Sequence, residues 1–267
     1  MTANPITSEA SADSIQMYAR TAGVLGLISI VAGGFGEAYV PAALVVSRDA
    51  VATATKIITS ESLFRWGFTG YLVEALCDAG LTLLFYLLLR AVRKDLALLA
   101  VFFRLIGTAG FAMAQVFYFA ALPIVGGADH LKAFSPEQLR SLALLSLQVS
   151  GYGQSVFTMF YGVGSVLLGY LMYRSRFLPK FIGILLALSG VGFVAKTFTW
   201  ALAPSYSSPL LLMPAGVAGL ALTGWLLVKE STPRNGRRQR HSRNLVSGVD
   251  EWLLPNPSLQ RTRFARR

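Results

Sequence analysis

Six long apolar segments, separated by short polar stretches, dominate the hydrophobic pattern of the chain. An apolar run of about 20 residues is long enough for one helix to cross the hydrocarbon core of a bilayer, which is about 30 Å thick. The pattern therefore predicts an all-α fold, a polytopic transmembrane bundle of six helices within residues 18–230. The expected spans are residues 20–40, 66–89, 96–122, 150–173, 181–202 and 209–228.

The composition agrees with a membrane environment. Only 14% of the 267 residues are charged, whereas soluble proteins contain about 25% charged residues. This low content argues against the soluble enzyme classes. A polar segment, residues 1–17, precedes the first span and carries two acids but no Lys or Arg. Signal peptides begin with a basic segment, so we expect no cleaved signal here and a first span that stays as an anchor.

The distribution of basic residues predicts the orientation of the bundle. Six spans place both termini on the same side, and that side holds 17 of the 24 Lys and Arg residues. The opposite side holds five, and the remaining two, Arg104 and Lys196, fall inside spans. Because cytoplasmic loops carry the excess of basic residues, both termini are predicted to be cytoplasmic.

A basic tail, residues 231–267, follows the last span. From Lys229 onward the chain contains ten Lys and Arg residues against three Asp and Glu, which accounts for most of the net charge of +11. The tail is poor in apolar residues and is predicted to be disordered. We expect it to contact anionic lipid headgroups. Nucleic acid is the alternative partner, but the tail has no recognition motif, so no specific nucleic-acid binding is predicted.

A helix start is visible ahead of the fourth span. Ser135 is a typical N-cap, Pro136 fits the first helical position, and Gln138 can complete a capping box. A helix from there to Tyr173 would be about 57 Å long. We therefore expect a break near residues 151–153, with residues 139–149 forming a short extra interfacial helix before span four. The alternative is a single tilted helix whose end is exposed.

Several short motifs occur in a fixed order along these spans. They are YARTAGVLGL with Gly36-Glu37, LFR, Asp78 leading into LLLRAV, LALLAVFFRL, and YRSRFLPKFIG. With them, residues 15–230 resemble the bacterial DUF4386 family of multi-span membrane proteins. The resemblance implies an integral protein of the bacterial inner membrane and brings no catalytic residues with it. Members of that family usually end soon after the last span, so the extension after Lys229 departs from the pattern.

Two opposite charges are predicted to meet near the middle of the membrane. Asp78 lies twelve residues before Arg90, and Arg104 lies ten residues after Lys94. Spans two and three form a tight hairpin, so these distances along the helices correspond to similar depths. A lone charge at the bilayer centre costs about 2.5–3.5 kcal/mol on insertion scales. We therefore predict an intramembrane ion pair between Asp78 and Arg104.

A second group of charges reaches the outer third of the bundle. Glu37, Glu74 and Lys196 lie sixteen or seventeen residues from the basic ends of their spans. We predict that they form an outer polar cluster around an outward-facing pocket. Glu74 also lies one helical turn from Asp78, so the two acids share a face. The expected rim of the pocket consists of Gln115, Tyr152 and Gln154.

Two interpretations of these charges stay open. They can form a structural ion-pair network that fixes helix register, or they can line a site for a small solute or a proton, because neighbouring carboxylates suit proton exchange. No catalytic motif is present, and Cys77, His130 and His241 are too few and too scattered for a zinc site. No metal or cofactor is predicted. The leading hypothesis is a membrane protein with a buried charged network, and the alternative is a proton-coupled transporter of a small solute.

Overall fold

The computed structural model describes residues 5–175, 178–206 and 208–228. The described residues from Asp13 to Val228 belong to one compact unit. The predicted basic tail, residues 231–267, lies outside the described residues. The compact unit contains all the candidate membrane spans.

The described chain folds into helices alone. In order they are α1 (Pro5–Gly33), the π-helix η1 (Gly34–Tyr39), α2 (Val40–Leu44), α3 (Ala50–Thr59), α4 (Glu61–Leu89), α5 (Lys94–Val125), η2 (Asp129–Leu131), α6 (Pro136–Arg174), α7 (Lys180–Leu202), η3 (Pro204–Tyr206), η4 (Pro209–Leu212) and α8 (Met213–Val228).

Six helical segments of the described chain are long and apolar enough to cross a membrane. They are Ile15–Leu44, Glu61–Leu89, Lys94–Val125, Pro136–Arg174, Lys180–Leu202 and Leu210–Val228. The predicted six-span, all-α architecture is thereby confirmed, and the protein is a multi-pass membrane protein.

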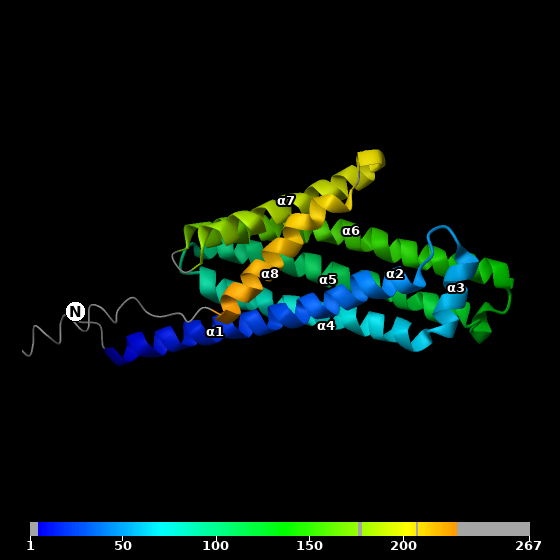
Figure 1. The fold of residues 1–267 in the computed structure, drawn as a ribbon, viewed down its shortest axis with the longest axis horizontal. Helices are drawn as coiled ribbons and strands as arrows, with labels where there is room; N and C mark the ends of the chain where they lie inside the picture. The colour runs from blue at the N-terminus through cyan, green and yellow to red at the C-terminus, as the bar shows by residue number, and fades with distance from the viewer. Residues whose placement is uncertain (1–4, 176–177, 207, 229–267) are drawn as a thin grey trace, which may run out of the picture. The chain divides into compact units, whose positions relative to one another are not determined.

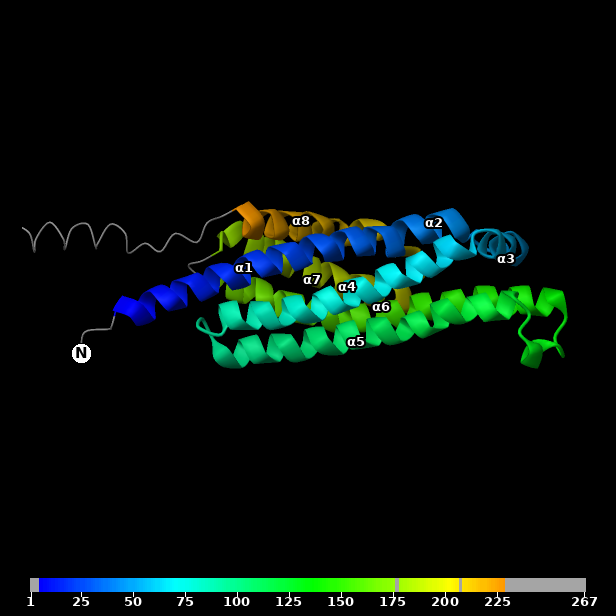
Figure 2. The ribbon, with the colours of Figure 1, turned by 90° about the horizontal axis from the view of Figure 1, so that it is seen from below.

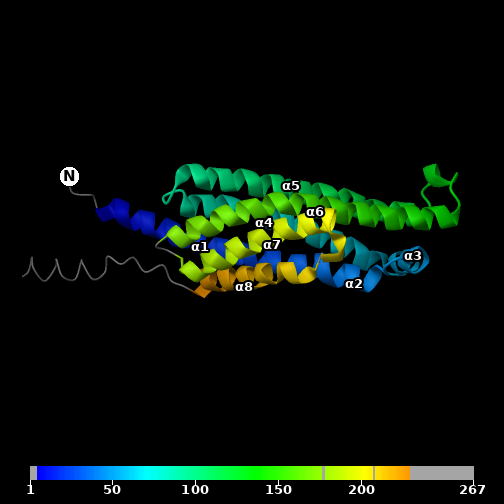
Figure 3. The same ribbon diagram turned by 90° about the horizontal axis from the view of Figure 1, so that it is seen from above.

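The six spans form a closed ring. Contacts join α4 to η1, α5 to α4, α6 to α5, α7 to α6, and α8 to α7. The last span then returns to the first, since Gly26 of α1 lies directly against Thr223 of α8. Figure 1 shows α8 crossing α1 obliquely. Figures 2 and 3 place α5 on one side of the bundle and α8 on the other. A ring of this kind can enclose a central space.

Glycines allow neighbouring spans to approach closely. A Cβ on Gly36 would lie 3.0 Å from the Gly67 carbonyl oxygen, where η1 crosses α4. A Cβ on Gly169 would lie 2.6 Å from the Gly183 carbonyl oxygen, where α6 crosses α7. Such small residues are typical of membrane helix interfaces, where packing replaces the hydrophobic effect as the force that holds helices together.

Helix α6 begins where the sequence predicts. The Ser135 hydroxyl accepts a hydrogen bond from the Gln138 backbone N–H at 3.3 Å, and the Gln138 side chain accepts one from the Ser135 N–H at 2.8 Å. Together with Pro136 in the first turn, these contacts form the capping box that the sequence indicates.

The predicted break near residues 151–153 is wrong, and no separate interfacial helix forms at residues 139–149. Helix α6 is continuous over 39 residues, about 58 Å at 1.5 Å per residue. The glycines do not break it, because Gly153 packs closely against Ala114 of α5 and thereby supports the helix pair. Helix α6 packs against both α5 and α3.

The short extra helix lies elsewhere, between spans one and two. Helix α3 begins at the N-cap Asp49, whose carboxylate accepts a hydrogen bond from the Ala52 N–H at 2.8 Å. Lys56 donates to the Ala43 carbonyl oxygen at 3.0 Å and so satisfies one open carbonyl near the end of α2. Ile57 is fully buried. Helix α3 therefore closes one end of the bundle, which we call the α3 end.

Two apolar clusters fill the two ends of the bundle. The cluster at the α3 end consists of Val40, Leu44, Ile57, Phe64, Tyr71, Tyr118, Ala121, Leu122 and Ala143. The cluster at the opposite end consists of Ala19, Ala22, Leu81, Phe85, Leu89, Ala97, Ala100, Leu168, Leu171, Met172, Leu178, Ile182, Leu186, Leu222 and Leu226. Along their spans, Glu37, Glu74, Asp78 and Arg104 lie between the parts that belong to the two clusters.

Candidate functional site: a polar cavity between two apolar clusters

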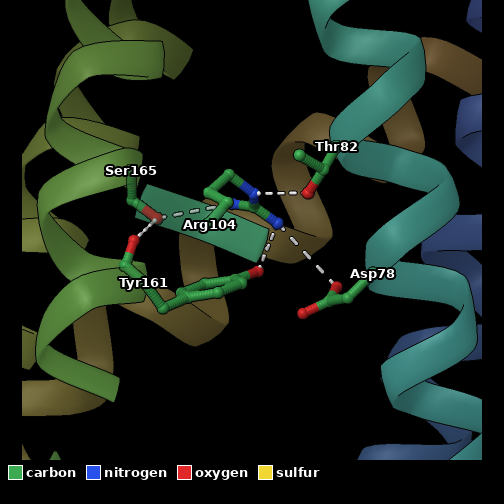
Figure 4. A network of polar contacts seen from close by, with 5 residues as sticks. All are labelled: Asp78, Thr82, Arg104, Tyr161 and Ser165. Carbon is green, nitrogen blue, oxygen red and sulfur yellow. Dashed lines mark hydrogen bonds and ion pairs between the residues drawn. The ribbon is translucent and has the colours of Figure 1, made fainter. Parts of the chain in front are cut away.

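Arg104 is the most deeply buried charged side chain among the described residues, with 3% of its surface exposed. Its Nε donates to Thr82 Oγ1 at 3.1 Å and its Nη1 to Ser165 Oγ at 3.4 Å. Its Nη2 donates to Tyr161 Oη at 2.6 Å and lies 3.9 Å from Asp78 Oδ1 (Figure 4). The guanidinium therefore uses partners from both neighbouring spans, α4 and α6.

The same cation also contacts an aromatic ring. Arg104 Cζ lies 4.0 Å from the centroid of the Tyr161 ring, within the range of a cation–π interaction. Ser165 Oγ donates in turn to the Tyr161 carbonyl oxygen at 2.9 Å. A charge at this depth would be costly without such partners. The structure thus gives Arg104 a set of neighbours that offsets its desolvation, with the Tyr161 hydroxyl as the closest.

A cavity of about 440 Å³ lies beside this group, between the two apolar clusters. All six spans contribute to its walls. Its polar or charged lining residues are Ser29, Glu37, Glu74, Asp78, Thr108, Gln154, Ser155, Thr158, Tyr161, Lys196 and Thr197. Its other lining residues are Ile30, Gly33, Gly34, Ala38, Gly107, Phe111, Phe193, Leu212, Ala215 and Gly216.

The predicted outer cluster of Glu37, Glu74 and Lys196 lies entirely on these walls. Glu37 comes from η1, a π-helical turn in the last third of span one. Turns of this kind change the direction of the side chains they carry and often occur at functional sites. Glu74 comes from α4, and its carboxylate lies directly against Gly33 of the first span.

Two polar atoms on the cavity walls have no partner within the described residues. They are Glu74 Oε2 and Thr108 Oγ1, both buried. Thr108 is only 7% exposed. Buried polar groups nearly always have a hydrogen-bond partner, so each exception requires an explanation. Here the two atoms lie on the wall of one space, which a water molecule or a bound solute can occupy.

Lys196 lines the cavity from α7 without forming a close ion pair. The ion pairs of the described residues are Arg65–Glu61, Arg104–Asp78 and Lys132–Asp129. Lys196 is in none of them, so its ammonium lies more than 4.0 Å from every described carboxylate. The acids and Lys196 therefore share the cavity without neutralising each other by direct contact.

Of the three residues predicted for the rim, only Gln154 lines the cavity. Gln115 is fully buried behind it and accepts a hydrogen bond from Gln154 Nε2 at 3.4 Å. Tyr152 packs against Trp200, with 5.3 Å between ring centroids, and is 47% exposed. Neither Tyr152 nor Gln115 lines the cavity, which differs from the predicted rim. Two residues along a helix correspond to about 200°, so Tyr152 and Gln154 point to nearly opposite sides.

The cavity reaches the surface of the bundle beside η1. Gly34, Glu37 and Ala38 on one side and Gly216 on the other are exposed, and all four line the cavity. Its mouth therefore lies between η1 and the first turn of α8, close to the tip of the hairpin that joins α7 to α8. The small side chains at this point leave the mouth open.

A second cavity of about 140 Å³ lies on the other side of Asp78. Asp78 and Tyr161 line both spaces. Arg104 lines only the smaller cavity and Lys196 only the larger one. Ser29, Ile30, Phe193 and Ala215 also line both spaces, so the two cavities adjoin each other along a shared boundary.

Several contributors to the site were not predicted from the sequence, among them Thr82, Thr108, Tyr161 and Ser165. Tyr161 and Ser165 follow Gln154 on α6 at intervals of seven and four residues, which places them on one helix face. That spacing was a usable signal for the residues that accompany Arg104. No comparable signal marks Thr108 in the span that it shares with Arg104.

Fold and site together define a six-span helical membrane protein with a polar cavity between its spans. A family profile described as "Domain of unknown function (DUF4386)" matches residues 21–229. The chain therefore belongs to the DUF4386 family, as the sequence motifs indicate. Neither the comparison with curated proteins nor the comparison with solved structures found a match.

Proposed function

We propose that this protein binds a small polar solute in the 440 Å³ cavity, and that Arg104 and its neighbours fix the helices beneath it. The observation that carries the proposal is the pair of buried, unpartnered atoms on the cavity wall, Glu74 Oε2 and Thr108 Oγ1. A purely structural network would use its polar atoms internally. Buried polar atoms without a partner require an explanation, and a solute bound in the adjoining space would supply one for Glu74 and Thr108.

We further propose that the protein resides in a bacterial inner membrane with both termini in the cytoplasm and the cavity facing outward. The distribution of basic residues supports this orientation. The mouth of the cavity lies near the α7–α8 hairpin, which is on the side opposite the termini in a six-span chain. The proposed partners are the bilayer, the solute and, for the basic tail, anionic headgroups.

Cysteine labelling tests whether the cavity is accessible from water. Cys77 is the sole cysteine, so Cys77→Ser provides a background for single introduced thiols. Thr158→Cys places a thiol on the cavity wall. Met113→Cys is the matched control, because the Met113 side chain is 66% exposed on the outside of α5. Met113 and Thr158 lie at similar depths, since Gly110 of α5 is in contact with Phe157 of α6.

Water-soluble methanethiosulfonates should label Thr158→Cys in membranes and leave Met113→Cys unlabelled, since the control thiol faces lipid. Both thiols should react after denaturation. If Thr158→Cys reacts only in the denatured protein, the cavity is closed to water and the proposal of a solute site fails.

The second cavity favours a proton-coupled transporter of a small solute as an alternative. Asp78 and Tyr161 lie on the boundary shared by two adjoining spaces, and a carrier exposes a buried site near the middle of the membrane to each side in turn. On this alternative, Glu74→Gln folds normally but loses uptake driven by a pH gradient in proteoliposomes. The transporter alternative would be excluded if uptake does not depend on the pH gradient, or if Glu74→Gln leaves uptake unchanged.

A further inference from the structure

We propose that the solute is a small organic monocation whose ammonium group binds among Glu37, Glu74 and Thr108. This inference deepens the proposed function and rests on it. It concerns the chemical class of the ligand, which follows from the charges, the free acceptor atoms and the size of the cavity.

The charges on the walls do not balance. Glu37, Glu74, Asp78 and Lys196 line the larger cavity. Asp78 has its own cation, since Arg104 Nη2 lies 3.9 Å from its Oδ1. Two carboxylates then face a single ammonium, that of Lys196. With both carboxylates ionised, the walls carry one uncompensated negative charge, which a proton or a ligand with one positive charge can neutralise.

The acceptor atoms fit an ammonium group. An ammonium has three donors and no acceptor. Glu74 Oε2 and Thr108 Oγ1 are free to accept within the described residues, and Glu37 adds a carboxylate at the exposed mouth. Thr108 provides evidence independent of the acids, because it is a neutral, 93% buried side chain on the cavity wall whose hydroxyl has no partner.

The cavity suits an organic cation better than a bare metal ion. No group of three or more His, Cys, Asp or Glu side chains in the described chain could hold a metal ion. The space of 440 Å³ is much larger than one ion, and Ile30, Phe111 and Phe193 provide apolar and aromatic surface on its walls. Such surface would contact the body of an organic ligand, and aromatic rings also attract cations.

Binding of radiolabelled benzylammonium to the purified protein tests the inference, with benzyl alcohol and benzoate as neutral and anionic competitors of the same shape. We expect saturable binding that neither competitor displaces. Glu37→Gln and Glu74→Gln should each weaken it at least tenfold. Glu137→Gln is the matched control, because Glu137 is exposed at the start of α6 and does not line the cavity.

The ammonium could come from a dissolved amine or from an ethanolamine lipid headgroup. The measurement is therefore repeated in phosphatidylglycerol nanodiscs with and without phosphatidylethanolamine. Loss of benzylammonium binding only when phosphatidylethanolamine is present identifies the lipid as the source. Equal binding in both identifies a dissolved amine. Both outcomes support an ammonium ligand.

Four outcomes would overturn the inference. Displacement by benzyl alcohol would show that charge is not recognised. Displacement by benzoate, abolished in Lys196→Gln, would show an anion site and leave the proposed solute site intact. If the Thr158→Cys thiol is labelled but the protein does not bind benzylammonium, the cavity is open to water and does not bind this cation. Absence of both binding and labelling would refute the proposed function as well.

Discussion

Replacing Arg104 by methionine should destabilise the bundle strongly, because the substitution keeps an apolar stem and removes the charge. It deletes the hydrogen bonds to Thr82, Ser165 and Tyr161. It also leaves Asp78, which is 17% exposed, without its cation. Removing one partner of a buried ion pair costs about 3–5 kcal/mol of unfolding free energy, and we expect a loss of that size.

An exposed ion pair of the same chain provides the control. Arg65 Nη2 lies 2.7 Å from Glu61 Oε1, much closer than the 3.9 Å between Arg104 and Asp78. The two side chains are 55% and 50% exposed, and exposed pairs contribute less than about 1 kcal/mol. Arg65→Met should therefore have a small effect. The comparison tests whether burial, rather than distance, determines the contribution of the pair.

The assay is unfolding by SDS in mixed micelles, followed by circular dichroism. Asp78→Asn combined with Arg104→Met should be less destabilised than Arg104→Met alone, because no charge is left unpaired. The reasoning is refuted if Arg104→Met costs no more than Arg65→Met. It is also refuted if the effects of the two single substitutions simply add in the double variant.

Three further predictions concern packing, capping and orientation. Gly164→Ala should lower the unfolding free energy by about 1–3 kcal/mol, since the new Cβ would lie 2.6 Å from Arg104 Cγ. Gly151→Ala is the control: its Cβ would meet nothing within 4 Å, so the change should be neutral or stabilising by up to about 1 kcal/mol. Equal losses of stability in the two variants would contradict the packing argument. Ser135→Ala should cost about 1 kcal/mol by removing the α6 cap, measured in the same unfolding assay, and an unchanged midpoint would contradict it. A green fluorescent protein fused to the C-terminus should fluoresce, as expected for a cytoplasmic end, whereas an active alkaline phosphatase fusion would reverse the orientation.

The number of spans and the depth of the charges could be predicted because both depend on distance along the chain. Apolar runs of sufficient length identify all six spans. Counting residues from the ends of a hairpin gives depth at a constant rise per residue. That count brought Asp78 and Arg104 to one level, and their side chains lie 3.9 Å apart.

The direction of a side chain around its helix was harder to predict, because it depends on packing between spans. Tyr152 and Gln154 have nearly the same depth, yet only Gln154 lines the cavity. The direction of the Glu37 side chain depends on a π-helical turn. Such a turn rotates the later side chains of the span around the helix axis, and a single sequence gives no clear signal for it. Helix α6 packs against α3 and α5, and contacts with segments distant in sequence cannot be recognised from the pattern within α6.

Tyr161 can distinguish a structural network from a carrier, because it lines both cavities and also hydrogen-bonds Arg104. Tyr161→Phe keeps the ring and removes one hydrogen bond to a charged group, so stability should fall by about 1.5–3 kcal/mol in either case. If the network is only structural, solute binding and its pH dependence stay unchanged in the folded variant. If Asp78 and Tyr161 separate the two sites of a carrier, binding to the larger cavity persists while uptake driven by a pH gradient changes. A variant that is destabilised but transports normally would therefore assign this contact to the stability of the bundle alone.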